Sequence, residues 1–229
     1  MAERLTSFTP GVWLDTMPVS ILGMRLTATM AVLDLGGGKL LLYSPLELTA
    51  ERRAAIEALG TIEHLYAPNT YHHMWIGAWA TAFPSAKLHG PAGLTEKRSD
   101  LKIDRTHATT PEPAFAGVVD EHHIDGFRLD ETVIVHRPSS TLVVADLVHN
   151  VGRPTGAWTV AYTKMMGFYD RVALSRAIRL GGFTDRPAAR RSLEGLLAQP
   201  FDRLVVGHGF PLDGGAREAI ANAYAWLLR

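Results

Sequence analysis

The hydrophobic residues of the chain fall into short runs whose lengths and spacing indicate strands alternating with helices. The runs at 61–68 (TIEHLYAP) and 141–146 (TLVVAD) are short, apolar and bounded by turn-forming residues, as buried strands are. At 49–60 (TAERRAAIEALG), by contrast, apolar residues recur at helical spacing after a capping Thr49, and Gly60 closes the pattern. A chain that alternates the two kinds of run is typical of a layered α/β fold.

The remaining runs extend this order. Apolar stretches on either side of GGGK (36–39) predict a hairpin-like start, and the glycines read as a plain turn because they lack the spacing of a phosphate loop. The later expected elements are a helix at 75–83, a strand at 86–90, two strands within 131–146, helices at 159–180 and 185–198, a strand at 201–209 and a helix at 215–228. Residues 92–120 carry no clear pattern. No repeat or linker divides the chain, so residues 1–229 are predicted to form one domain.

Composition narrows the classes of partner. Lys plus Arg and Asp plus Glu both number 23, which leaves no basic surface typical of nucleic-acid or membrane binding. The N-terminus lacks the charged-then-apolar order of a secretion signal, and no apolar run approaches the length of a membrane span, so we expect a cytoplasmic protein. The chain has no cysteine and ten histidines, which leaves imidazole and carboxylate chemistry open.

Three segments share one arrangement, in which residues of the metal-ligand type follow an apolar strand. They are LYAPNTYHH with His72 and His73, LVVADLVH with Asp146, and LVVGHG with His208. Strand ends in layered α/β proteins bring distant loops to one crevice, so these side chains are expected to meet. Their nitrogen and oxygen atoms are donors that zinc and non-haem iron accept.

These motifs, in this order, resemble the metallo-β-lactamase superfamily, and most closely a branch with a Pro-Asn then His-His stretch. The resemblance spans nearly the whole chain. It implies an αβ/βα four-layer sandwich with the metal site at the edge between two sheets, and hydrolysis by a metal-bound water. The common first motif of the superfamily is His-x-His-x-Asp-His, from which this chain departs.

The departure concerns the first metal position. If His72 and His73 stand where Asp-His is usual, Pro68 and Thr70 take the places of the first two histidines and cannot replace them as ligands. The resemblance then implies one mononuclear site, with His72, His73, Asp146 and His208 as ligands. The expected cofactor is one divalent metal ion, zinc in the first place and iron as the alternative. Four protein ligands would fill a tetrahedral zinc shell, whereas catalytic zinc usually keeps one position open.

The other histidines receive separate predictions. His136 and His149 are predicted to serve catalysis beside the metal, by supporting the ligands, lining the pocket or donating a proton. His122 and His123 lie where the superfamily often has a further ligand, and their role stays open. The remaining three, His64, His89 and His107, are expected to be structural or exposed.

The first hypothesis is therefore a metal-dependent hydrolase acting on an ester, lactone, thioester or similar bond of a small molecule. β-Lactam hydrolysis is not expected, because the paired first-site histidines are missing. A protein that kept the scaffold but lost turnover, and a mononuclear iron oxidoreductase, are the alternatives. The expected partner is a small-molecule substrate, and the formation of a homodimer is left open.

Overall fold

Two β-sheets form the centre of the protein. The computed structural model describes residues 5–107 and 110–229. The larger sheet has seven strands in chain order: β1 (Thr6–Thr9), β2 (Val12–Ile21), β3 (Met24–Asp34), β4 (Lys39–Tyr43), β5 (Thr61–Tyr66), β6 (Lys87–Gly90) and β7 (Arg105–Thr106). The smaller sheet has the order β11-β10-β9-β8, with β8 (Val119–His123), β9 (Thr132–His136), β10 (Thr141–Val143) and β11 (Arg203–Val205). Strands β1 to β4 pair antiparallel and β4 to β7 pair parallel, so the carboxyl ends of β4 to β7 share one edge of the sheet.

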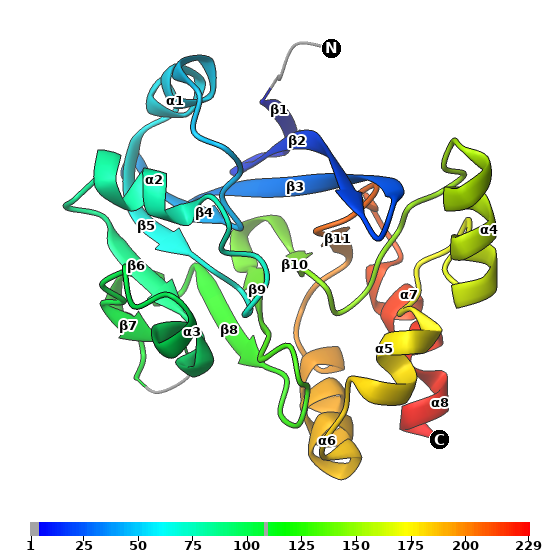
Figure 1. Ribbon diagram of the computed structural model, residues 1–229. Coiled ribbons are helices and arrows are strands. Elements are labelled where there is room, and N and C mark those ends of the chain that lie inside the picture. Colours follow the sequence, from blue (N-terminus) through cyan, green and yellow to red (C-terminus); the bar gives the residue numbers. More distant parts are fainter. Residues whose placement is uncertain (1–4, 108–109) are drawn as a thin grey trace.

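Helices cover the outer face of each sheet (Figure 1). On the larger sheet lie α1 (Ala50–Glu57), α2 (Ile76–Ala82) and α3 (Ala92–Lys97). On the smaller sheet lie α6 (Arg186–Leu197), α7 (Ala216–Ala223) and α8 (Ala225–Leu228). The helices α4 (Ala157–Met166) and α5 (Arg176–Gly181) follow β10 and lie at one end of the sandwich. The order of layers is helix, sheet, sheet, helix, which confirms the predicted αβ/βα four-layer sandwich.

Both faces of the central strands are buried. In β3, Met30 and Val32 face the core under α1 and α2, whereas Ala31 and Leu33 face the core between the sheets. This alternation follows from the two-residue period of a strand, because successive side chains point to opposite faces. Strands buried on both faces give continuous apolar runs in the sequence, so the sequence predicts these strands.

The helix starts at 49 and 185 agree with the sequence prediction. The hydroxyl of Thr49 accepts the backbone N–H of Arg52, and the carboxylate of Asp185 accepts that of Ala188. Each satisfies a backbone donor that has no partner within its helix. The GGGK segment is a turn, in which Lys39 donates its backbone N–H to Gly36.

Three segments differ from the sequence prediction. The predicted helix at 159–180 is divided into α4 and α5, because α4 ends at Gly167, whose φ of +81° stops the helix in the left-handed region. The chain before GGGK is itself a β2–β3 hairpin that turns at Leu22 and Gly23. The unassigned stretch 92–120 contains α3, β7 and the start of β8. None of the helices within the described ranges has the length and hydrophobicity that crossing a bilayer requires.

Candidate metal centre

Three side chains of the metal-ligand type meet where the carboxyl ends of three strands come together. His72 follows β5, Asp146 follows β10 and His208 follows β11. The Nε2 atom of His72 lies 3.3 Å from Oδ2 of Asp146, and Nε2 of His208 lies 3.5 Å from Oδ1 of the same carboxylate. One potential ligand atom from each of the three residues lies within 4.8 Å of the other two. The structure thus brings together three of the four residues predicted as ligands.

The position of His72 depends on Asn69. The side-chain oxygen of Asn69 accepts the backbone N–H groups of Tyr71 and His72, both at 2.8 Å. This bonding folds the chain into a tight turn directly after β5. On the imidazole itself, Nδ1 contacts the hydroxyl of Ser44 at 2.8 Å, which directs Nε2 toward Asp146.

Asp146 is held by a second, fully buried carboxylate. Glu131 accepts the backbone N–H groups of Ala145, Asp146 and Leu147 at 2.9, 2.9 and 3.2 Å. The amide nitrogen of Asn69 contacts both Glu131 and Asp146, each at 3.0 Å. Glu131 therefore shapes the Asp146 turn and, through Asn69, connects it to the turn that carries His72.

His208 has its imidazole fixed by a backbone carbonyl. Its Nδ1 lies 2.8 Å from the carbonyl oxygen of Thr27, and because a carbonyl only accepts, Nδ1 carries the proton. In the neutral ring Nε2 then presents a lone pair to the carboxylate of Asp146. Two acceptors that face each other need a cation between them, either a proton or a metal ion. Metal-binding histidines are commonly oriented by such a carbonyl contact.

Gly207 is required for this approach of the chain. A Cβ atom at this position would lie 2.6 Å from the carbonyl oxygen of Ala145 and 2.9 Å from Cε1 of His72. Both distances are shorter than a side chain tolerates. The glycine before His208 therefore lets β11 lie against the other two parts of the site.

The neighbouring charges shift the pKa values of Asp146 and His72 in opposite directions. Burial by itself raises the pKa of Asp146, but the adjacent His72 and His208 hold that pKa well below its ordinary value. Burial by itself lowers the pKa of His72, whereas Asp146 raises it to above the ordinary value. Both shifts favour the ion pair of a protonated His72 and an ionised Asp146. A divalent ion would balance the carboxylate without the proton.

His73 and His136 lie outside this group. Nδ1 of His73 lies 3.2 Å from a guanidinium nitrogen of Arg98, because neighbouring side chains in the turn diverge, so His73 contributes no atom to the group. His136 stands at the end of β9, where Nδ1 contacts Ser139 at 2.7 Å and Nε2 contacts the carbonyl of Asp34 at 2.9 Å. His73 and His136 thus bond to other parts of the protein, and the group of three potential ligands contains neither of them.

His149, His122 and His123 are the other histidines that the sequence analysis considered for the site. His149 is buried next to the group, with its ring centre 5.6 Å from that of His208, and its Nδ1 has no hydrogen-bond partner among the described residues. His122 contacts the backbone carbonyl of Ser192, and His123 contacts the hydroxyl of Thr132. His122 and His123 thus bond to other parts of the protein and contribute no atom to the group.

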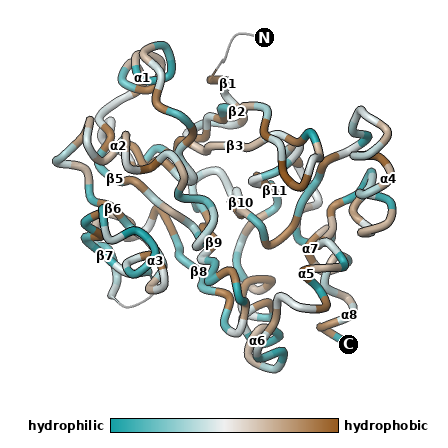
Figure 2. Tube along the Cα trace, viewed as in Figure 1, coloured by the Kyte–Doolittle hydropathy of each residue, from teal (hydrophilic) through white to brown (hydrophobic). Residues whose placement is uncertain are grey.

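A largely apolar cavity opens over the three ligand-type residues. It has a volume of about 580 Å³, and its apolar lining includes Met17, Val19, Ile21, Met74, Trp75, Leu129 and Ile178. A smaller cavity of about 220 Å³ adjoins it at Asp146 and His208 and contains His149 and Phe168. The described residues that line the two cavities include no lysine or arginine. The hairpin tip at Ile21 and Leu22, brown in Figure 2, borders both spaces.

Glu131 and Asn69 contact the site residues, and the ligand pattern of the sequence did not single them out. Glu131 precedes an apolar strand, and nothing in its local sequence distinguishes it from an exposed acidic residue. Asn69 belongs to the Pro-Asn stretch of the first motif, and nothing in that stretch predicts a contact with Asp146.

Comparison with known proteins gives a result at the level of structure. No protein-family model and no curated protein sequence matches the chain. Among solved structures, a metallo-β-lactamase from Pontibacter korlensis superposes with a TM-score of 0.66 over 99% of both chains, at 16% sequence identity. The mono-zinc form of the metallo-β-lactamase FIM-1 from Pseudomonas aeruginosa gives 0.65 at 11% identity, covering 100% of this chain and 98% of the other. A metallo-β-lactamase from Hirschia baltica gives 0.63 at 12% identity, with 100% and 99% covered.

Proposed function

The chain has the metallo-β-lactamase fold, and from this premise we propose that it is a metal-dependent hydrolase with a single divalent ion held by His72, Asp146 and His208. The bond cleaved is an ester, lactone, thioester or similar bond of a small apolar molecule. The observation that carries the proposal is the convergence of these three ligand atoms within 4.8 Å of one another at the edge of a cavity.

The number of protein ligands supports catalysis. Catalytic zinc sites commonly use three protein ligands and leave a position open for water or substrate. His73 lies against Arg98 and not at the group, so the objection that four ligands would close the site does not apply. The donors fit the ion, because one carboxylate and two imidazoles suit zinc and iron alike. A divalent ion bound there would supply Lewis acidity toward water and a carbonyl oxygen.

The surrounding residues would orient the ligands and the substrate. Glu131 and Asn69 hold Asp146 and the turn of His72 in place through the contacts described above. His149 lines the smaller cavity next to His208, and its buried Nδ1 has no hydrogen-bond partner among the described residues. Burial lowers the pKa of His149 to about 4, so at neutral pH its ring is neutral and can donate one hydrogen bond and accept another.

The lining of the cavities favours an uncharged substrate. A buried carboxylate or phosphate on the substrate would need a cationic partner, and the described lining residues provide neither lysine nor arginine. Apolar side chains would bind acyl or alkyl groups on either side of the reacting carbonyl. With equal numbers of acidic and basic residues in the chain, we propose a small molecule and not a nucleic acid as partner.

An iron oxidoreductase is the second candidate. Two histidines and one carboxylate are also the donor set of many non-haem iron oxygenases, and this observation favours the alternative. Metal content of protein expressed without added metal, together with oxygen consumption and ester hydrolysis assays, separates the two functions.

The test compares His208→Ala with His73→Ala. The first removes a ligand, and the second removes a neighbouring imidazole that lies outside the group. We expect His208→Ala to abolish hydrolysis and to lose one equivalent of metal, whereas His73→Ala keeps both. Retention of hydrolysis in folded His208→Ala, or a metal-loaded wild type that hydrolyses no ester, lactone or thioester, would contradict the proposal. The second outcome leaves the iron oxidoreductase, or a binding protein that kept the scaffold.

A further inference from the structure

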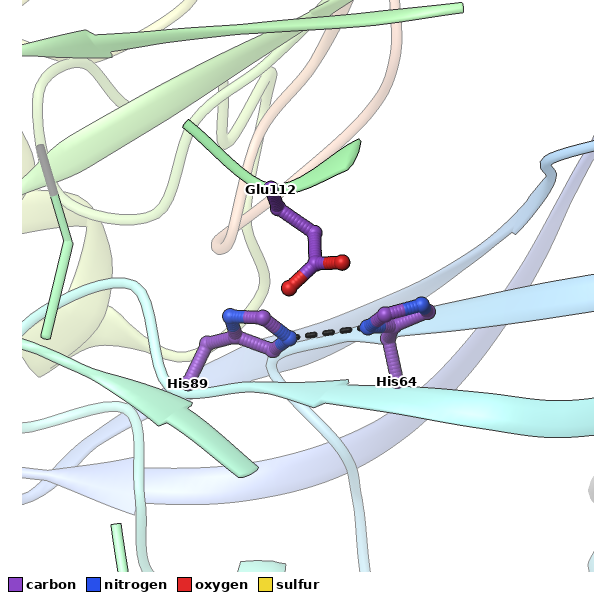
Figure 3. A group of neighbouring side chains, drawn as sticks. All are labelled: His64, His89 and Glu112. Carbon is purple, nitrogen blue, oxygen red and sulfur yellow. Dashed lines mark hydrogen bonds between the residues drawn. The ribbon is translucent and has the colours of Figure 1, made fainter. Parts of the chain in front are cut away.

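A second group of ligand-type side chains lies on the inner face of the larger sheet. His64 belongs to β5 and His89 to the adjacent β6, while Glu112 lies in the segment that follows β7 (Figure 3). One potential ligand atom from each lies within 4.8 Å of the other two, and all three residues are buried. This group shares no residue with the group of His72, Asp146 and His208, so it is a separate feature of the protein.

The two histidines face each other directly. Nδ1 of His64 and Nε2 of His89 are 2.8 Å apart, a distance at which one proton lies between the two nitrogens. The strand pairing produces this contact, because β5 and β6 run parallel and both imidazoles project from the same face. A tetrahedral zinc ion about 2.1 Å from each nitrogen would separate them by about 3.4 Å, so a small rotation of the rings is enough to admit it.

Glu112 completes a three-donor set. Figure 3 shows its carboxylate turned toward the two facing imidazoles. Its oxygens accept hydrogen bonds from Lys87 at 3.1 and 3.2 Å and from the backbone N–H of Ala114 at 3.3 Å. The backbone contact orients the carboxylate as outer contacts orient metal ligands. The side chain of Lys87 is 54% exposed, so its ammonium group can move into solvent when another cation takes its place.

The group of His64, His89 and Glu112 is covered by an aromatic ring on one side and lies beside a surface groove on the other. The ring of Phe115 packs on both histidines, with centroid distances of 5.1 Å to His64 and 5.4 Å to His89. A groove of about 320 Å³ on the outside has Lys87 and Glu112 in its wall and so reaches the carboxylate end of the group. An ion could therefore reach Glu112 without opening the core.

Arg105 also faces the group but is bound elsewhere. Its guanidinium donates to Glu121 at 2.9 Å and to the carbonyl of Thr110 at 2.7 Å, while its contact with Nδ1 of His89 is long, at 3.4 Å. Binding of an ion through Nε2 of His89 would place the remaining proton on Nδ1. With the proton on Nδ1 of His89, Arg105 loses only its long contact with that nitrogen, and Glu121 still neutralises its charge.

We infer that His64, His89 and Glu112 form a second, buried site for one divalent transition-metal ion of the zinc type. Two neutral imidazoles and one carboxylate give it a three-donor set that zinc accepts. The ion would join two neighbouring strands to the segment before β8, so its role is structural. This inference does not depend on the proposed hydrolase.

The experiment counts ions in variants of the full chain. Metal-free wild type, His208→Ala, Glu112→Gln and the double variant are titrated with Co²⁺, whose visible absorption reports the coordination. Glutamine keeps the size of Glu112 and an acceptor for Lys87 but removes the anionic ligand. We expect the wild type to bind two equivalents of Co²⁺, each single variant to bind one, and the double variant to bind none. We also expect Co²⁺ to raise the Tm of His208→Ala by roughly 5 °C and to leave the Tm of the double variant unchanged.

Several outcomes decide the inference. It is overturned if His208→Ala binds no ion, or if Glu112→Gln binds as many ions as the wild type. If the wild type binds one ion that survives in His208→Ala and is lost in Glu112→Gln, this site stands and the proposed hydrolytic centre fails. Lys87→Met removes the competing ammonium group and keeps the fold of the groove, so we expect tighter Co²⁺ binding in the His208→Ala background. Weaker binding there would contradict the inference.

Discussion

The buried carboxylate of Glu131 accepts the backbone N–H of Asp146 at 2.9 Å, although Glu131 precedes β9 and Asp146 follows β10. The same carboxylate also accepts the N–H groups of Ala145 and Leu147. An anion with three backbone donors keeps a turn in one conformation, as a metal ligand requires. Glu131 thus serves as a positioning residue for Asp146.

We predict that Glu131→Gln weakens both folding and metal binding. The amide nitrogen of glutamine cannot accept a hydrogen bond, so at least one buried N–H group loses its partner. The expected loss in the free energy of unfolding is about 1–3 kcal/mol, and the expected loss in metal affinity is about 10- to 100-fold. Denaturant unfolding and a metal titration measure the two effects. Glu57→Gln, on the exposed end of α1, is the control and should change neither quantity.

Gly207→Ala is predicted to disturb the metal centre directly. The new Cβ would lie 2.6 Å from the carbonyl oxygen of Ala145 and 2.9 Å from the ring of His72, so the two turns must move apart. We expect a destabilisation of about 1–3 kcal/mol and loss of tight metal binding. The matched control is Gly181→Ala, since a Cβ there meets no atom within 4 Å. Equal stability and metal affinity in the two variants would argue against the close approach at Gly207.

The pH dependence of stability should carry a contribution from His149. Burial lowers the pKa of its imidazole to about 4, below the ordinary value of about 6.5. Between these values the unfolded chain binds a proton that the folded protein does not, so stability decreases as the pH falls from about 6.5 to 4. The expected slope is about 1.4 kcal/mol per pH unit.

His149→Gln removes this titration. Unfolding of the metal-free wild type and of the variant, measured from pH 4 to 7, should show a shallower dependence in the variant. His123→Gln, on the half-buried strand β8, is the control. Identical curves for the wild type and His149→Gln would mean that His149 titrates alike in both states.

Substrate selectivity is predicted to depend on Ile21, which lines both cavities beside the metal centre. Ile21→Ser removes apolar contact, so KM for esters of medium-length acids should rise about three- to tenfold, while KM for acetate esters changes less. The control is Leu180→Ser, because Leu180 is 77% exposed and lines neither cavity. A uniform change over all acyl lengths would indicate that the apolar wall does not bind the acyl group.

Much of this architecture could be predicted from the sequence, for a physical reason. Strands buried on both faces leave continuous apolar runs, and the residues directly after them lie at one edge, so the convergence of His72, Asp146 and His208 was accessible from spacing. The direction in which each side chain points, by contrast, could not be predicted from spacing. His73 differs from His72 by one position, yet it lies against Arg98.

Contacts between residues far apart in the sequence could not be predicted from these patterns. Glu131 acts through the backbone of a turn far along the chain, and no sequence period records such a contact. His64 and His89, which the sequence predicts to be structural or exposed, are buried in adjacent strands and contact each other. Their approach depends on the register between β5 and β6, which becomes visible only in the folded sheet.

The three ligand-type residues come from both halves of the sandwich, since His72 follows a strand of the larger sheet while Asp146 and His208 follow strands of the smaller one. An ion can therefore be captured there only after the two sheets have docked. Metal should therefore leave the rate of the rate-limiting refolding step unchanged. It should instead slow unfolding, because the bound ion links the larger sheet to the smaller one. The time course of metal binding during refolding would then report when the two sheets have docked.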